Sequence, residues 1–190
     1  MNALRLVDAT SLRTQAWANG AGTTTVIASE PDDADWRWRL SIADIAQETA
    51  FSTFADTRRQ FVPLDAPVQL RFNDARTTPL LRLSVTRFDG GDAPYALLPE
   101  GPTRAFNLML RGSAEGELIA RPLNGSMWLP LRAGWRWFVH VLGGHAEIQV
   151  NDEHLAVNAG ANLWIDAQPG ERVHIEGGGE LVLVQLATGH

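Results

Sequence analysis

The sequence predicts an all-β fold, and three observations support this prediction. Apolar and polar residues alternate with a period of two, as in half-buried strands, over residues 37–43, 68–72, 80–88 and 146–150. Two continuous apolar runs, residues 137–142 and 180–186, are typical of strands that are buried on both faces. Glycine, proline, asparagine and aspartate separate these segments, and no segment has a convincing helical period.

The composition is that of a globular protein and excludes several classes of function. The chain has 190 residues, of which 45% are hydrophobic and 20% charged, with a net charge of −6. Its basic residues are scattered, whereas binding to nucleic acid or to an anionic membrane requires clustered positive charge. Without cysteine there are no disulfides, zinc-thiolate sites, iron–sulfur clusters or cysteine nucleophiles. No signal peptide or membrane-spanning run is recognised, so a cytoplasmic location is expected.

The second half of the chain resembles the cupin pattern. Between residues 137 and 186, short strands alternate with expected turns, including a Gly-Gly turn at 143–144 and a glycine-rich turn at 177–179. The segment VLGGHAEIQV is similar to the end of the first cupin motif, and AGANLWIDAQPGERVHI is similar to the second. The first half has a comparable strand set. We therefore expect a bicupin, two stacked and tightly packed cupin-like barrels of the RmlC-like jelly-roll type, over residues 1–101 and 102–190.

A metal site and the common hydrolase sites are not expected. An active cupin needs a His-x-His pair, a glutamate and a later histidine, but the segment WLPLRAGWRW, where the pair would fall, has no histidine. Structural or solvent-facing roles are expected for the five histidines, which are His140, His145, His154, His174 and His190. There is no Gly-x-Ser-x-Gly elbow, and no Gly-x-Gly-x-x-Gly lies between a strand and a helix. We therefore predict no catalytic residues, no metal and no cofactor.

The segment WANGAGTTT, residues 17–25, looks at first like a phosphate-binding loop. A loop of the Walker type requires a lysine and a following helix, whereas the β-branched residues after this segment favour a strand. A glycine turn leading into an edge strand would explain the glycines, but it would leave Trp17 and Asn19 without a role.

Four motifs in order resemble the signature of the HutD/Ves family. They are WANGAGTTT, WRWRLSIADI, AFSTFADTRRQF and GPTRAFNLMLR, between residues 17 and 111. The resemblance implies a bicupin without a metal or an established catalytic activity. It also implies an association with histidine utilisation, in which members bind an intermediate such as formylglutamate and limit expression of the pathway.

The motif positions provide the candidate ligand-binding residues. Strand alternation places Arg39 and Ser41 on one face, where the Arg39 guanidinium could hold a carboxylate with two hydrogen bonds, worth about 1.5–3 kcal/mol. The alternatives without a role in ligand binding are a solvent-facing Arg39 on an amphipathic strand, and arginines at positions 59 and 104 that lie beside turns. The candidates are Trp17, Asn19, Gly20, Thr23, Arg39, Ser41, Phe51, Ser52, Arg59, Arg104 and Asn107.

The chain departs from the family pattern at five positions. Ala21 and Asp56 stand where the pattern has glycine, Ala55 where it has proline, and Arg58 and Ala105 where it has aspartate. Two of the changes remove acidic residues near the expected cavity, which would make it more positive and could alter its specificity. Ala21 would matter only if its position required a positive φ.

Three functions follow as hypotheses. The leading one is a metal-independent bicupin that binds a small carboxylate resembling formylglutamate and acts as a sensor or regulator. The alternatives are a cupin-type isomerase or hydrolase in which Arg39 and Asn107 polarise a carbonyl, and an interaction protein whose cavity is filled by side chains. Neither nucleic acid nor membrane is an expected partner, and a homodimer is left open.

Overall fold

The computed structural model describes residues 2–31 and 34–189, which form two compact units. One unit comprises Thr10–Ala114, and the other comprises the residues up to Ala9 together with those from Glu115 onward. Apart from the short 3-10 helices η1 (Ala9–Ser11) and η2 (Gly90–Asp92), every regular element in the described ranges is a strand. The prediction of an all-β chain is therefore confirmed.

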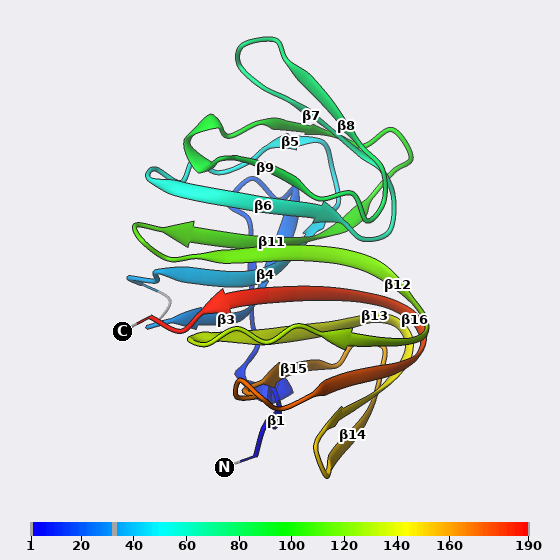
Figure 1. Ribbon diagram of the computed structural model, residues 1–190. Coiled ribbons are helices and arrows are strands. Elements are labelled where there is room, and N and C mark those ends of the chain that lie inside the picture. Colours follow the sequence, from blue (N-terminus) through cyan, green and yellow to red (C-terminus); the bar gives the residue numbers. More distant parts are fainter. Residues whose placement is uncertain (1, 32–33, 190) are drawn as a thin grey trace. The chain divides into compact units, whose positions relative to one another are not determined.

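Two antiparallel sheets enclose the core of the unit Thr10–Ala114. The strands of the larger sheet are, in order, β2 (Arg13–Ala16), β3 (Gly22–Glu30), β4 (Trp38–Ile45), β11 (Thr103–Arg111), β6 (Thr57–Pro63) and β9 (Thr86–Asp89). The strands of the smaller sheet are β5 (Thr49–Ala50), β10 (Tyr95–Leu97), β7 (Val68–Arg71) and β8 (Thr77–Leu80). Apolar residues from both sheets, among them Phe61, Leu70 and Ala105, form one buried cluster. In Figure 1, β4, β11 and β6 lie side by side.

The second unit contains one six-stranded sheet with long central strands. Its order is β1 (Leu4–Leu6), β15 (Asn162–Ile165), β13 (Trp135–Val150), β16 (Val173–Ala187) and β12 (Gly116–Leu129), with β14 (Glu153–Asn158) paired to β13. Alternate residues of β13 and β16, such as Val139, Ile148 and Ile175, pack into its apolar core.

The expected boundary near residue 101 differs from this division into units. Strand β11 begins at Thr103, yet it pairs with β4 on one side and β6 on the other, in the middle of a sheet of the first unit. Strand β1 lies near the start of the chain but pairs with β15 in the second unit. The segment 99–102 is therefore a turn within the first unit, because strand pairing rather than chain order defines the units.

The glycine-rich turns expected at 143–144 and 177–179 were predicted wrongly. Both segments lie inside continuous strands, where β13 and β16 run side by side with a bulge between Val141 and Gly143. A Cβ atom on Gly144 would overlap the carbonyl oxygen of Gly178, and one on Gly179 would overlap that of Gly143. These glycines thus permit close approach of two strands at a bulge, a role that glycine also has in strands.

We expect Gly144→Ala to be among the most destabilising small substitutions in this unit. Gly144 has a φ of +75°, and the added Cβ would meet backbone that cannot rotate away. Gly170 is a matched control, because its φ is +99° but a Cβ there would meet open space. Gly170→Ala should cost about 1–2 kcal/mol from backbone strain alone, and Gly144→Ala about 2 kcal/mol more. Equal losses in urea unfolding of the two variants would contradict the close-approach argument.

The strand expected over 80–88 is also interrupted. β8 ends at Leu80 and β9 begins at Thr86, with a turn between them in which Leu83 has a φ of +63°. The period-two pattern continues through this turn, which has no glycine, proline or asparagine to mark it, and Leu81 is 70% exposed. Alternation alone therefore could not locate the break.

Candidate functional site

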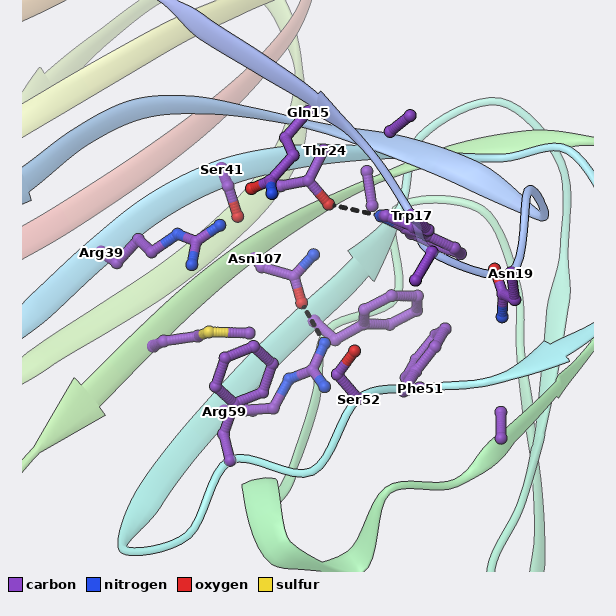
Figure 2. A pocket seen from close by; sticks show the side chains of 17 residues that line it. Gln15, Trp17, Asn19, Thr24, Arg39, Ser41, Phe51, Ser52, Arg59 and Asn107 are labelled. Carbon is purple, nitrogen blue, oxygen red and sulfur yellow. Dashed lines mark hydrogen bonds between the residues drawn. The ribbon is translucent and has the colours of Figure 1, made fainter. Parts of the chain in front are cut away.

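A cavity of about 480 Å³ opens into the unit Thr10–Ala114. Its base is formed by β4, β11 and β6 of the larger sheet. One wall is formed by β2 and the turn that follows it, and another by the segment from Ala50 to Phe54. Figure 2 shows the side chains that line it.

The strand register brings polar side chains into two adjacent rows on the base of the cavity. Ser41, Asn107 and Phe61 lie opposite one another across the three strands. Arg39, Met109 and Arg59 form the next row, two residues further along each strand. The predicted alternation of Arg39 and Ser41 on one face of their strand is thus confirmed, and this face is the one that lines the cavity.

Arg59 is the most unusual residue of the site because its charged side chain is only 5% exposed. Its Nη2 donates a hydrogen bond of 2.7 Å to Oδ1 of Asn107, which is also buried. Its guanidinium carbon lies over three phenyl rings, at 5.1 Å from the centre of Phe51, 5.8 Å from Phe54 and 5.0 Å from Phe88. Within the described residues, neither Nε nor Nη1 of Arg59 has a hydrogen-bond acceptor.

The electrostatic environment of Arg59 opposes its positive charge. Burial, and secondly the charge of Arg39, lower the pKa of Arg59 from the ordinary value of an arginine to about 9. The three phenyl faces offset only part of this cost, because a cation–π contact contributes about 0.5–2 kcal/mol. None of the described residues that line the cavity is acidic, so the lining supplies no carboxylate to Arg59.

The turn at WANGAGTTT forms the wall above this base, and its polar groups mainly stabilise the turn itself. Nε1 of Trp17 donates to the Thr24 hydroxyl at 2.8 Å. Asn19 donates through Nδ2 to the Thr49 hydroxyl at 2.8 Å, and its Oδ1 accepts from the backbone N–H of Ala21 at 3.0 Å. Trp17 and Asn19 both line the cavity, and these bonds fix the wall in place.

Eight of the eleven candidate residues line the cavity, and three do not. The eight are Trp17, Asn19, Arg39, Ser41, Phe51, Ser52, Arg59 and Asn107. Gly20 has a φ of +70° in the turn, and Thr23 falls on the opposite face of β3 from Thr24. Arg104 forms two 2.8 Å hydrogen bonds with Asp65, and these bonds lower the pKa of the Asp65 carboxyl.

Several lining residues were not among the candidates. Phe54 and Met109 belong to the quoted motifs, and Phe61 follows Arg59 at the two-residue spacing of one strand face, so alternation could have identified them. Gln15 lies outside the motifs, on β2. Phe88 on β9 does not line the cavity, but its ring lies against the Arg59 guanidinium. Only the order of the strands in the sheet brings these two residues to their places.

The departures from the family pattern have local explanations. Ala21 is buried and is not among the residues of positive φ, so its turn needs no glycine there. Asp56 replaces a glycine of the pattern and has a φ of +53°, a conformation that aspartate tolerates better than most residues. Arg58 caps the carbonyls of Gly112 and Ala114 and does not line the cavity, unlike its neighbour Arg59. No lining or capping role is found for Ala55.

Ala105 bears most directly on the charge of the cavity. It is fully buried in the apolar cluster and lies on the same strand face as Asn107, two residues along β11. An aspartate at this position would be a carboxylate beside the base of the cavity. With alanine, this position does not offset the charge of the arginines.

The four histidines that the structure describes lie outside the cavity lining. Nδ1 of His140 is 2.9 Å from Oδ1 of Asn162 in the buried part of the second unit, and the His174 ring is 4.6 Å from that of Trp128. His190 lies outside the described residues. Over residues 2–31 and 34–189, no three His, Cys, Asp or Glu side chains form a group that could hold a metal ion. No helix in the same ranges is long and apolar enough to cross a membrane.

Comparisons with known proteins found a matching family and several proteins of similar sequence. The model of the HutD family matches residues 9–183. The chain is 33% identical over 112 residues, 57% of its length, to an uncharacterized 21.2 kDa protein in the hutC 3' region of Pseudomonas putida. It is 35% identical over 107 residues, 55% of its length, to protein Ves of Citrobacter koseri. These matches span 59% and 56% of the two relatives.

The solved structures support the fold over nearly the whole chain. HutD from Pseudomonas fluorescens SBW25, in a structure described as a formate condition, is 25% identical with a TM-score of 0.78. The similarity covers 97% of this chain and 98% of that one. A cupin 2 conserved barrel domain protein from Leptotrichia buccalis is 11% identical with a TM-score of 0.55, over 86% and 88% of the two chains. The cupin-type jelly-roll fold that the sequence predicts is thus confirmed.

Proposed function

The chain belongs to the HutD family, which is associated with histidine utilisation, and on this premise we propose that it binds a small carboxylate in the Arg39–Arg59 cavity. The proposed ligand is an acidic intermediate of histidine breakdown such as formylglutamate. The proposed role is that of a sensor or regulator rather than an enzyme.

The observation that carries this proposal is the state of Arg59. A buried guanidinium whose Nε and Nη1 have no acceptor among the described residues is costly, because each unsatisfied buried donor loses about 1–3 kcal/mol. Arg59 lines a cavity of about 480 Å³, a size typical of small-molecule sites. A carboxylate would supply both the acceptors and the compensating charge.

The chemistry of the lining favours binding over catalysis. The seventeen described lining residues include no histidine, aspartate, glutamate, cysteine, lysine or tyrosine, so they offer no ordinary general acid or base. The cavity also disfavours the hypothesis of a side-chain-filled interaction module, since space remains beside Arg39, Trp17 and Asn19.

A thermal-shift screen tests the proposal. Formylglutamate, glutamate and formate are added to the full chain, with formamide as a neutral control. At one hundred times its Kd, a ligand adds about 2.7 kcal/mol to the free energy of unfolding, which raises the Tm of a chain of this size by roughly 5–10 °C. If none of the acids shifts the Tm beyond formamide, the proposal fails. Turnover of formylglutamate, followed by NMR of its formyl proton, would favour the enzyme alternative.

A further inference from the structure

We propose that residues 50–54 form a lid over the Arg59 guanidinium, and that the hydrogen bond between Asn19 and Thr49 is the latch that holds the lid closed. This inference rests on the proposed function and adds how the ligand gains access to Arg59. The latch should control the rates of binding and release, and it should have little effect on the affinity.

The donors proposed to bind the ligand are covered in this structure. Nε and Nη1 of Arg59 are buried, and the whole residue is only 5% exposed. Of the three rings over its guanidinium carbon, those of Phe51 and Phe54 belong to the lid. A carboxylate can reach these donors only if the groups that cover them move.

The lid is the covering element best able to move. The third ring, Phe88, lies on β9, which pairs with β6 in the larger sheet. The lid, by contrast, follows the two-residue strand β5 and has no regular structure before β6 begins. Two backbone hydrogen bonds outside the sheets hold it, from Phe51 to Pro94 and from Phe54 to Gly90. A segment with so few backbone hydrogen bonds opens at a low cost in free energy.

The latch joins the start of the lid to the wall formed by β2 and its turn. Nδ2 of Asn19 donates to the Thr49 hydroxyl at 2.8 Å, and Thr49 directly precedes the lid. Oδ1 of Asn19 accepts from the N–H of Ala21, which fixes the orientation of the amide. Figure 2 shows Asn19 and Phe51 on the two walls that the latch connects. Thr49 itself does not line the cavity, so its hydroxyl serves the latch rather than the ligand.

Thr49→Val removes the latch and leaves the cavity lining unchanged. NMR line shapes during a titration with formylglutamate give the association rate, the dissociation rate and the Kd. We expect both rates to rise about fivefold, as for the loss of one neutral hydrogen bond, and the Kd to change less than about twofold. In the Asn19→Ala background, which already lacks the latch, Thr49→Val should not change the rates further. Unchanged rates, or a rise in the dissociation rate alone, would overturn the inference.

Thr14→Val is the matched control for this experiment. The Thr14 hydroxyl lies 2.8 Å from the Thr25 hydroxyl, and neither residue lines the cavity. The variant therefore also loses one hydroxyl bond of the same wall, but it keeps the latch. Its association and dissociation rates should match those of the unaltered chain, and a fivefold rise here too would mean that general loosening of the wall produces the effect.

Exchange of the Arg59 Nε–H with water, measured without added acid, tests the lid independently of binding. This N–H is buried, so its exchange requires an opening of the lid. It should be about fivefold faster in Thr49→Val than in the unaltered chain or in Thr14→Val. Equal exchange in all three chains would contradict the lid and its latch. Faster exchange in Thr49→Val, together with no binding of any acid, would reject the proposed function and leave the lid standing.

Discussion

Replacing Arg59 by methionine is expected to abolish carboxylate binding while making the ligand-free protein more stable. The binding loss follows from removal of the buried donors, since two charge-assisted hydrogen bonds are worth about 3–5 kcal/mol. Affinity should therefore fall by more than about a hundredfold. Titration calorimetry with formylglutamate measures this loss, and urea unfolding measures stability.

The gain in stability follows from the cost of the buried charge. A pKa lowered from the ordinary value of an arginine to about 9 corresponds to a penalty on the order of 5 kcal/mol for charged Arg59 in the folded chain. Methionine has a similar length and fits among the three phenyl rings. Leaving Oδ1 of Asn107 without its donor costs about 1–3 kcal/mol. The lost cation–π attraction costs about a further 0.5–2 kcal/mol, so the net free energy of unfolding should rise by up to about 3 kcal/mol.

Arg71→Met is the matched control for this experiment. Arg71 is an exposed arginine on β7 of the same unit, over the ring of Tyr95 at 5.1 Å, and it does not line the cavity. Its replacement should change binding less than about twofold and stability by less than about 1 kcal/mol. If Arg59→Met binds the acid normally, or unfolds more easily than the unaltered chain, Arg59 is structural rather than a ligand-binding residue.

Carboxylate affinity should be constant between pH 6 and 8 and should fall above pH 9, by up to tenfold per pH unit. The bound anion favours charged Arg59, so above the lowered pKa of about 9 binding requires uptake of a proton. Titrations in buffers of different ionisation enthalpy should show almost no proton uptake at pH 7 and nearly one proton at pH 10. Affinity that stays constant from pH 8 to 10.5 would contradict this linkage.

The stability of the ligand-free chain should also depend on the ionisation of Arg59, but it should rise with pH in the range in which the carboxylate affinity falls. Between about pH 9 and the ordinary pKa of an arginine, the unfolded chain keeps the Arg59 proton that the folded chain has released. The unfolded state therefore binds more protons, and the contribution of Arg59 to stability rises with pH in this window. The Arg59→Met variant lacks this contribution, so the difference in stability between the variant and the unaltered chain should shrink as the pH is raised.

Alternation identified the all-β fold and the shared face of Arg39 and Ser41, whereas the family motifs supplied the other candidates that line the cavity. The period of two in WRWRLSIA places Arg39 and Ser41 together, and the family motifs add Arg59 and Asn107 from other strands. What alternation could not provide is the pairing of distant strands. The arrangement of Arg59 over Phe88 depends on β6 pairing with β9.

The errors have a common physical origin in the ambiguity of glycine and of polar side chains. Gly144 and Gly179 read as turn residues, but they permit close contact of two strands. Arg104 reads as a ligand donor, but its register position turns it toward Asp65. Each of these residue types suits two structural roles, and which role it takes depends on the strand that lies next to it.

The central claim is that an anion completes the hydrogen bonding of Arg59, and NMR of the arginine Nε–H groups tests it most directly. The Arg59 resonance is assigned by its absence in Arg59→Met, and formylglutamate is then added to saturation. We predict that this resonance moves downfield and that its exchange with water slows, as expected for a new charge-assisted hydrogen bond to the buried guanidinium. Saturable binding that leaves the Arg59 resonance unchanged would contradict the account.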